Sequence, residues 1–389
     1  MPNVYVFAVC GGKEHIDTLN FSIGFLTRRT KNRVVVVTNL SRNTEQINHS
    51  DVVSVETPKS FNDHQAAIWL KTSLHRILPK GNVYMYLDTD ILAIGDNVDA
   101  VFQEYISPIR FAADHCRVKQ FSPYAVNCDC LKTREEYRRR INVILAEADP
   151  LFNTTNTRLR QLRKQLETVF FQLKQNKIKA AFTALRYFSA LKRFDLNPDF
   201  YFDKQKKIWF YKDGTAVIYH VSMRKAAKQA GLRYNAFKDQ IEPPDGLSIW
   251  LDRCDHLTQY ISQKFKVTVA EKDWQHWNGG VFLFDDDSYN FLETWHQYTL
   301  QIFQDPKWKT RDQGTLIATV WKFGLQNQPV LNPTWNCLAD HFNQNLALSA
   351  DKQMLTLDGE NFFAPEFAHI YHHWGDTTWD IWNWAASKA

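Results

Sequence analysis

Four short apolar runs, separated by segments with helical spacing, dominate the first part of the chain. The runs lie at residues 4–9, 34–37, 52–55 and 83–87, and a helix-like pattern between residues 65 and 78 stops at Pro79. Apolar runs of this length without polar alternation are typical of strands buried on both faces. Because they alternate with helices, they predict an α/β fold with a Rossmann-like mixed, mainly parallel sheet flanked by helices.

A helical, basic segment interrupts this pattern. Residues 133–193 are rich in Lys, Arg, Gln and Leu, and Asp213-Gly214 is a strong signal for a hairpin turn. Pro243 and Pro244 mark its end, and strand-like runs resume at residues 265–269 and 280–284, followed by a helix. We therefore expect the α/β domain in two parts, residues 1–132 and 246–389, with a helical insertion and a hairpin at residues 133–245.

Two carboxylates follow the last of the four apolar runs, in the motif Asp88-Thr89-Asp90. Open α/β sheets bind ligands at the carboxyl ends of their parallel strands, and side chains two residues apart face the same side. We expect Asp88 and Asp90 to bind Mg²⁺ or Mn²⁺, which leaves coordination sites for diphosphate oxygens. A solvated turn is the alternative, but apolar residues flank this motif on both sides.

Three later motifs carry further polar groups. Asn278, Gly279 and Gly280 open an apolar strand and let backbone approach a ligand, although paired glycines also form ordinary turns. Asp312 and Gln313 stand at an expected helix start, where an Asp is commonly only an N-cap. Near the C-terminus, a histidine cluster that includes His369 and His372 can complete a metal site begun by carboxylates. Spacing alone does not decide between these two histidines.

The order of these motifs resembles that of the GT-A fold glycosyltransferases, above all glycosyltransferase family 8, the galactosyltransferase and glycogenin-like group. The resemblance covers roughly residues 4–113 and 267–379. It implies that Asp88, Asp90 and His372, the last in a His-x-x-Gly motif, hold the metal. It also implies that Asp312 and Gln313 lie beside the anomeric carbon as the catalytic pair.

The resemblance implies a donor site as well. The residues expected to contact the nucleotide-sugar are Ala8, Val9, Cys10, Gly11, Lys71, Asp88, Thr89, Asp114, Asn278, Gly279, Gly280 and Gly375. Among them Asp114 is a separate candidate for the sugar pocket, and a plain surface Asp is the alternative for it. Lys71 stands where the family has an Arg, which keeps the charge but loses the bidentate fork. Residues 376–379, Asp-Thr-Thr-Trp, replace the family's Lys-Pro-Trp, so a phosphate-binding Lys is missing.

These features predict a metal-dependent glycosyltransferase of the hexosyltransferase type. It would move a sugar from a nucleotide-diphosphate sugar, a UDP-sugar, to a glycan or lipid-linked acceptor with retention of configuration. A non-catalytic sugar- or nucleotide-binding protein of the same fold is the alternative, favoured by the missing Lys and opposed by the intact Asp-x-Asp. A phosphatase-type Asp-x-Asp is disfavoured, because it follows a first strand and has a Thr two residues later, whereas Ile91 and Leu92 follow here.

Basic residues are concentrated in one stretch of a chain whose net charge is +5. Ten Lys and Arg residues but a single acid, Glu167, lie between Arg158 and Arg193. This stretch is either a solvated helical face or a surface for peripheral contact with an anionic membrane; nucleic acid is the least favoured partner. The six cysteines show no disulfide framework, and no apolar run is long enough to span a bilayer. Because the first residues lead directly into an apolar run, we expect no leader segment. We expect a cytoplasmic chain, at most peripheral at the inner membrane face.

Overall fold

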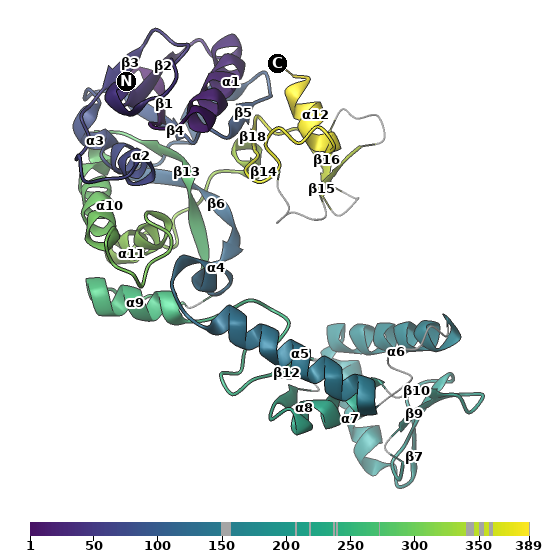
Figure 1. Ribbon diagram of the computed structural model, residues 1–389. Helices are drawn as coiled ribbons and strands as arrows, with labels where there is room; N and C mark the ends of the chain where they lie inside the picture. The colour runs from purple at the N-terminus through teal and green to yellow at the C-terminus, as the bar shows by residue number, and fades with distance from the viewer. Residues whose placement is uncertain are drawn as a thin grey trace. The chain divides into compact units, whose positions relative to one another are not determined.

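The expected sheet is present in this computed structural model, built from N-terminal strands and one strand of the C-terminal half (Figure 1). Its strands follow the order β3 (Val52–Ser54), β2 (Arg33–Thr38), β1 (Asn3–Ala8), β4 (Val83–Leu87), β13 (Gln275–Phe284) and β6 (Ile109–Arg117). The first four pair in parallel, whereas β13 runs antiparallel to both β4 and β6. The prediction of a mixed, mainly parallel sheet is confirmed.

The chain divides into two units, and each is described by itself. Unit 1 comprises Met1–Cys128 and Asp255–Ala389, and unit 2 comprises Asp129–Cys254. The structure describes residues 1–148, 157–206, 208–217, 219–235, 238, 240–271, 273–339, 346–349, 354–357 and 361–388. Within these ranges, no helix is both long enough and apolar enough to cross a membrane.

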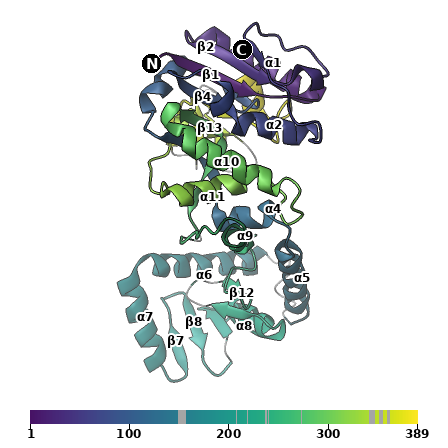
Figure 2. The same cartoon turned by 90° about the vertical axis from the view of Figure 1, so that its left-hand side faces the viewer.

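Helices cover both faces of the sheet in unit 1. Successive side chains of a strand point to opposite faces, and in these strands both sets are apolar, so each face needs a covering layer. Tyr5 and Phe7 of β1 join an apolar cluster with α1 (Lys13–Arg29), whereas Val4 and Val6 join a second cluster on the other face. That second cluster includes α2 (Asp63–Thr72), α9 (His256–Phe265), α10 (Tyr289–Ile302) and α11 (Gln313–Phe323). Figures 1 and 2 show α2, α10 and α11 together on one side of the sheet. The remaining helices of this unit are α3 (Leu74–Ile77), α4 (Val118–Ala125) and α12 (Asp380–Ala386).

A small three-stranded sheet joins the C-terminal part of unit 1 to the end of β4. Its order is β14 (Cys337–Leu338), β18 (Phe367–His369) and β5 (Ile91–Ala93). Strand β18 pairs antiparallel with β5, with His369 opposite Ile91. Since β5 begins one residue after Asp90, this pairing brings the C-terminal segment to the Asp-x-Asp motif. Strands β15 (Leu346–Leu348), β16 (Leu355–Leu357) and β17 (Asn361–Phe363) form a further antiparallel sheet.

Unit 2 combines helices with a small antiparallel sheet. Its helices are α5 (Cys130–Ala148), α6 (Thr157–Gln175), α7 (Lys177–Ser189) and α8 (Tyr219–Gln229). The sheet is formed by β7 (Arg193–Asp195), β8 (Phe200–Asp203), β9 (Ile208–Tyr211) and β10 (Ala216–Val217), and β11 (Arg233–Asn235) pairs with β12 (Gln240–Glu242). The expected hairpin is present: β9 pairs with β10, and Gly214 between them has a φ of 85°.

Several expected boundaries differ from the structure. The helix expected at residues 65–78 is two helices, α2 and α3, separated at Ser73. Residues 266–270 are not a strand, because α9 occupies 256–265 and the following segment buries Val267 and Val269 without pairing in a sheet. The insertion, expected at 133–245, extends to 129–254, because α5 begins at Cys130 and Ile249 N donates to Ile241 O.

Candidate active site

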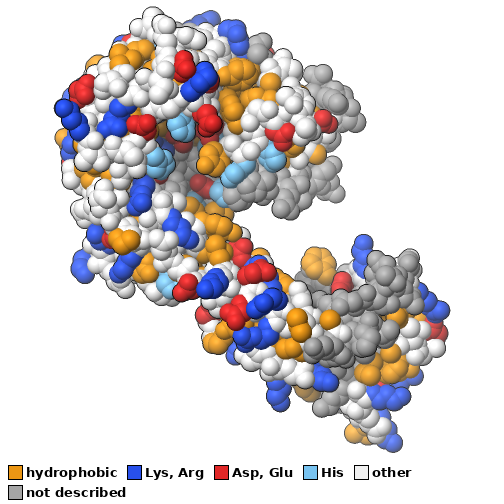
Figure 3. Space-filling model, viewed as in Figure 1, with side chains coloured by type: hydrophobic (Ala, Val, Ile, Leu, Met, Phe, Trp, Pro, Cys, Tyr) orange, Lys and Arg blue, Asp and Glu red, His pale blue; other side chains and the backbone are white. Residues whose placement is uncertain are grey.

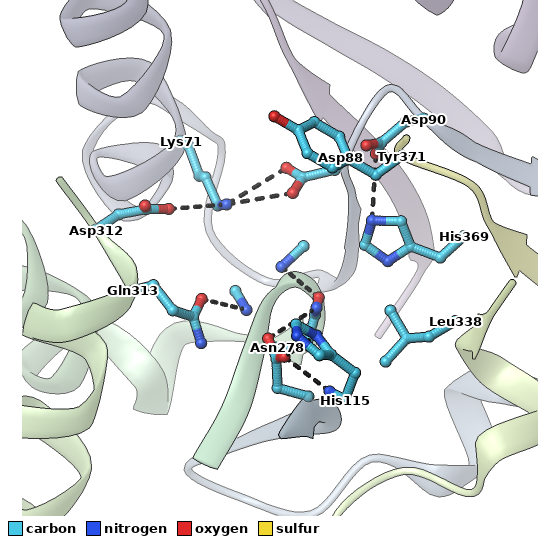
Figure 4. A pocket seen from close by; sticks show the side chains of 13 residues that line it. Lys71, Asp88, Asp90, His115, Asn278, Asp312, Gln313, Leu338, His369 and Tyr371 are labelled. Atoms are coloured by element: carbon cyan, nitrogen blue, oxygen red, sulfur yellow. Dashed lines mark hydrogen bonds and ion pairs between the residues drawn. The ribbon is translucent and has the colours of Figure 1, made fainter. Parts of the chain in front are cut away.

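A pocket of about 250 Å³ lies at the carboxyl end of β4 in unit 1 (Figure 4). The residues that line it are Lys71, Asp88, Asp90, Asp114, His115, Asn278, Gly279, Gly280, Asp312, Gln313, Leu338, His369 and Tyr371. Figure 3 shows acidic and histidine side chains gathered around a hollow on this unit. The pocket therefore brings together, from six segments of unit 1, most of the polar side chains that the sequence motifs contain.

A buried lysine connects two of the carboxylates. Lys71 Nζ, from α2, lies 3.0 Å from Asp312 Oδ2 and 3.3 Å from Asp88 Oδ1. Burial alone would lower the pKa of Lys71, but Asp312 and Asp88 raise it above its ordinary value, so this ammonium group stays charged. The side chain of Asp312 makes no helix-capping hydrogen bond, so its carboxylate serves the ion pair with Lys71 and not α11.

Asp88 combines burial with a directional hydrogen bond. Its Oδ1 accepts a hydrogen bond of 2.6 Å from the hydroxyl of Tyr86, and its backbone N–H donates to Gly280 O at 2.8 Å. Burial raises the pKa of Asp88, and Lys71 opposes this shift. The last residues of β4 and the neighbouring strand β13 thus fix the orientation of this carboxylate.

His369, and not His372, lies beside the second carboxylate of the motif. His369 Nε2 is 3.4 Å from Asp90 Oδ1, and Ile370 N donates to Asp90 O at 3.0 Å. The other ring nitrogen, Nδ1, is 3.0 Å from Asn336 Oδ1. An amide oxygen only accepts, so Nδ1 carries a proton, and Nε2 is the ring nitrogen that faces Asp90. Burial alone would lower the pKa of His369, but Asp90 raises it above its ordinary value.

Two glycines of β13 let the strand pass directly beneath these side chains. A Cβ on Gly280 would lie 2.5 Å from Asp88 Oδ2. A Cβ on Gly279 would lie 2.9 Å from Gln313 Oε1 and 3.5 Å from Lys71 Nζ. A Cβ does not approach another atom to within about 3 Å, so a side chain at Gly280 would displace the Asp88 carboxylate and one at Gly279 would displace the Gln313 amide.

The amide of Gln313 is held by three contacts. Its Oε1 accepts a hydrogen bond of 3.1 Å from Gly279 N, and its Nε2 donates to Trp277 O. The same Nε2 lies 3.0 Å from Nδ1 of His276, a fully buried ring whose pKa is lowered mainly by burial. Since a neutral imidazole accepts at one nitrogen, this contact fixes which way the Gln313 amide points.

Asp114, from β6, lines the pocket beside Asn278. Its Oδ2 accepts a hydrogen bond of 3.2 Å from Asn278 Nδ2, and its Oδ1 lies 2.6 Å from His115 Nδ1. Burial alone would raise the pKa of Asp114, but His276 and His115 lower it below its ordinary value. Asp114 is therefore an ionised acceptor that faces the pocket.

Other residues expected at the donor site lie elsewhere. Ala8, Val9, Cys10 and Gly11 are buried at the end of β1, where Gly11 has a φ of 107° and its N–H donates to Asn43. Thr89 contributes its carbonyl to a hydrogen bond from Ser22. None of these residues lines the pocket.

The expected third metal ligand is also elsewhere. His372 is exposed and stacks edge-on against Tyr371, and Gly375 forms an exposed turn with a φ of 74°. The reason is the pairing of β18 with β5, which ends at His369 and sets His369 beside Asp90 before the chain turns away.

The donor set suits a hard divalent cation. Asp90 Oδ1 is buried and accepts no well-formed hydrogen bond from the described residues; its neighbour is His369 Nε2 at 3.4 Å, and a cation held by both groups would satisfy this oxygen. Two carboxylates and an imidazole whose Nδ1 is already hydrogen-bonded match the ligands of Mn²⁺ or Mg²⁺ sites. Asp88, Asp90 and His369 thus have the chemistry of a divalent-metal donor set, but their ligand atoms do not all lie within 4.8 Å of one another, so all three would hold a metal only after Asp88 moves closer to Asp90 and His369.

Four residues that line or support the pocket are not among the site residues predicted from the sequence: His115, His276, Leu338 and Tyr371. For one of them the sequence held a signal. His276 lies two residues before Asn278 on the same strand, so both side chains point to the same face. The others come from segments whose position depends on tertiary packing.

No family model matches the chain, and the comparison with curated proteins finds no match. Among solved structures, the fold is similar to the apo structure of the bifunctional glycosyltransferase WbbM, with a TM-score of 0.37 and 11% identity. That match covers 95% of this chain and 45% of WbbM, so the chain spans less than half of its length. The apo form of mouse xyloside xylosyltransferase 1 is similar with a TM-score of 0.36 and 12% identity, over 95% of this chain and 97% of that one.

Proposed function

We propose that unit 1 is a metal-dependent glycosyltransferase that moves a sugar from a nucleotide-diphosphate sugar, a UDP-sugar, to a glycan or lipid-linked acceptor. One observation carries this proposal. The pocket places Asp88, Asp90 and His369 on one side and Asp312 with Gln313 on the other, at the carboxyl end of a parallel strand. This is the edge at which α/β sheets bind ligands, and the sequence motifs resemble those of family 8.

The residues divide into a diphosphate side and a sugar side. Asp88, Asp90 and His369 would hold Mn²⁺ or Mg²⁺, which neutralises charge on a leaving diphosphate. Lys71 stays charged beside them and adds positive potential. On the sugar side, Asn278 and Asp114 form a hydrogen-bonded pair that can accept bonds from sugar hydroxyls.

Asp312 and Gln313 would line the reactive face of the donor sugar. The Gln313 amide is oriented by Gly279 and His276, so its position does not depend on the substrate. Asp312 is ion-paired with Lys71, and burial of this pair lets the carboxylate stabilise a developing positive charge at the anomeric carbon. Transfer with retention is the outcome that the family resemblance implies.

Calorimetric titration of UDP in the presence of Mn²⁺ tests the donor site. Asp90→Asn removes one proposed ligand and should abolish Mn²⁺-dependent UDP binding. Asp96→Asn is the matched control, since this exposed carboxylate lies on the same segment but does not line the pocket. Unchanged Mn²⁺-dependent UDP binding by Asp90→Asn would contradict the role of Asp90 as a metal ligand.

A further inference from the structure

Helix α7 of unit 2 exposes an apolar face. Ile178, Phe182 and Leu185 follow the spacing of one helix face and are 73%, 65% and 66% exposed. Phe188, in the last turn of α7, and Leu191, two residues after the helix ends, are 77% and 93% exposed and extend this surface. We name these five residues the α7 apolar face. Single exposed apolar residues are common on soluble proteins, but a contiguous group of large ones marks an interaction site.

The side of α7 opposite the apolar face packs against the small sheet of unit 2 and so sets the orientation of the helix. Tyr187 packs edge-on against Phe194 of β7, with ring centroids 5.3 Å apart, and tilted against Phe202 of β8 at 5.9 Å. Lys204 Nζ lies 4.6 Å from the Tyr187 ring and donates to Ala190 O. Figure 2 shows α7 at the edge of the unit, beside β7 and β8. Since Tyr187 faces the sheet, the apolar face must point away from it.

The charged residues from Lys177 to Arg193 are all basic, and an anion follows only at Asp195, which is ion-paired with Arg193 at 2.8 Å. Residues 177–193 contain no Asp or Glu, and their five cations, Lys177, Lys179, Arg186, Lys192 and Arg193, are all exposed. At 3.6 residues per turn, Lys177 lies on one side of the apolar face, and Lys179 and Arg186 lie on the other. A helix with an apolar stripe bordered by cations combines the two attractions that an anionic bilayer surface offers.

Other occupants fit less well. A second copy of the chain would bring two sets of the same cations together around the contact, which is repulsive. Nucleic acid would satisfy the cations but would leave Ile178, Phe182 and Leu185 against a charged backbone. We propose that α7 docks unit 2 on an anionic membrane surface, with the apolar face at the boundary between headgroups and acyl chains. This proposal does not depend on the activity of unit 1.

Vesicle co-sedimentation of the full chain tests it. The wild type should sediment with vesicles of phosphatidylcholine and phosphatidylglycerol at low salt, and much less with phosphatidylcholine alone. The double variant Phe182→Asp/Leu185→Asp should weaken binding more than about tenfold, because it places two anions in the apolar face. Lys179→Gln and Arg186→Gln should each weaken it roughly fivefold. Val143→Asp, at an exposed apolar position on α5, is the matched control and should bind as the wild type.

Three outcomes would overturn the proposal. One is a wild type that does not bind anionic vesicles at low salt. The second is equal binding by the double variant and the wild type, with both folded by circular dichroism. The third is a wild type that sediments as a dimer while the double variant sediments as a monomer, which would make the α7 apolar face a contact between copies. Loss of vesicle binding in the double variant, together with unchanged binding in Val143→Asp, would support docking of the α7 apolar face on an anionic membrane.

Discussion

The choice between two histidines shows how a single side chain defines the proposed metal site. His369 Nε2 lies 3.4 Å from Asp90 Oδ1, whereas His372 is exposed three residues later. His369→Gln should therefore lower the affinity for Mn²⁺ by at least about tenfold, and His372→Gln should change it by less than about twofold. Titration of Mn²⁺ followed by electron paramagnetic resonance measures both. A larger loss for His372→Gln would contradict the site as described.

Among the pocket residues, Gly280 lies so close to the Asp88 carboxylate that even a methyl side chain at this position would collide with it. Gly280→Ala would place a Cβ 2.5 Å from Asp88 Oδ2 and displace either the carboxylate or β13. We expect Mn²⁺-dependent UDP affinity to fall at least about tenfold, since small misplacements of a binding group are costly. Gly12→Ala is the control, because nothing lies within 4 Å of its Cβ and its φ is −68°. Equal calorimetric affinities for the two variants would show that Asp88 is not positioned by this close approach.

At the same scale, the sequence predicts which residues form the site better than it predicts which of them contact one another. The motifs that contain Asp88, Asp312 and Gln313 also supply these side chains to the pocket. The role of His369 depends on the register between β18 and β5, and Asp312 pairs with Lys71 across two helices. Neither contact leaves a local pattern in the sequence, because both join segments far apart in the chain.

At the scale of elements, a buried histidine joins α10 to α2 and makes their packing sensitive to acid. His296 is fully buried, with Nδ1 2.8 Å from the hydroxyl of Thr72, and burial lowers its pKa to about 4. An unfolded His has a pKa of about 6.5, so the unfolded chain binds the proton first as pH falls. This residue should lower stability progressively from about pH 6.5 to about pH 4, by on the order of 2–3 kcal/mol. Urea unfolding of His296→Gln and the wild type between these values measures it; identical pH slopes would contradict the role of His296.

The elements themselves were predictable where one face or both faces are apolar over several residues. The strands near residues 4–9, 34–37 and 83–87 occur close to their expected ends. The strand expected at residues 265–269 is absent, although Val267 and Val269 are both buried. These side chains join the apolar cluster beside α10 and α11 from an extended segment that pairs with no neighbouring strand in the described part of the chain. Burial produces the same alternation as sheet pairing, so the pattern alone does not distinguish them.

At the scale of the whole molecule, the pocket belongs to unit 1, and the α7 apolar face belongs to unit 2. We expect amide hydrogen exchange to distinguish the proposed nucleotide site from the proposed membrane-binding surface. UDP with Mn²⁺ should slow amide exchange in β4, β13 and β18, and anionic vesicles should slow it in α7, since each ligand contacts only its own unit. Protection of α7 by UDP alone, without protection of β13, would contradict the placement of the nucleotide site.

The insertion was recognisable in the sequence, but its limits were not. Its basic helical composition changes sharply from the flanking α/β pattern, whereas Pro243 and Pro244 precede the true end of unit 2 by several residues. Residues after the two prolines stay with unit 2 because Arg138 donates to Ile249 O and pairs with Asp252. Such contacts between distant segments set a domain boundary more strongly than local turn residues do.

The release of UDP from UDP-sugars by the full chain tests the central claim most directly. We predict release from at least one UDP-sugar that stops when a chelator is added, returns with Mn²⁺, is lost in Asp90→Asn and persists in Asp96→Asn. UDP binding without release from any UDP-sugar, in the presence of acceptor glycans and lipid-linked acceptors, would contradict the assignment and identify a sugar- or nucleotide-binding protein.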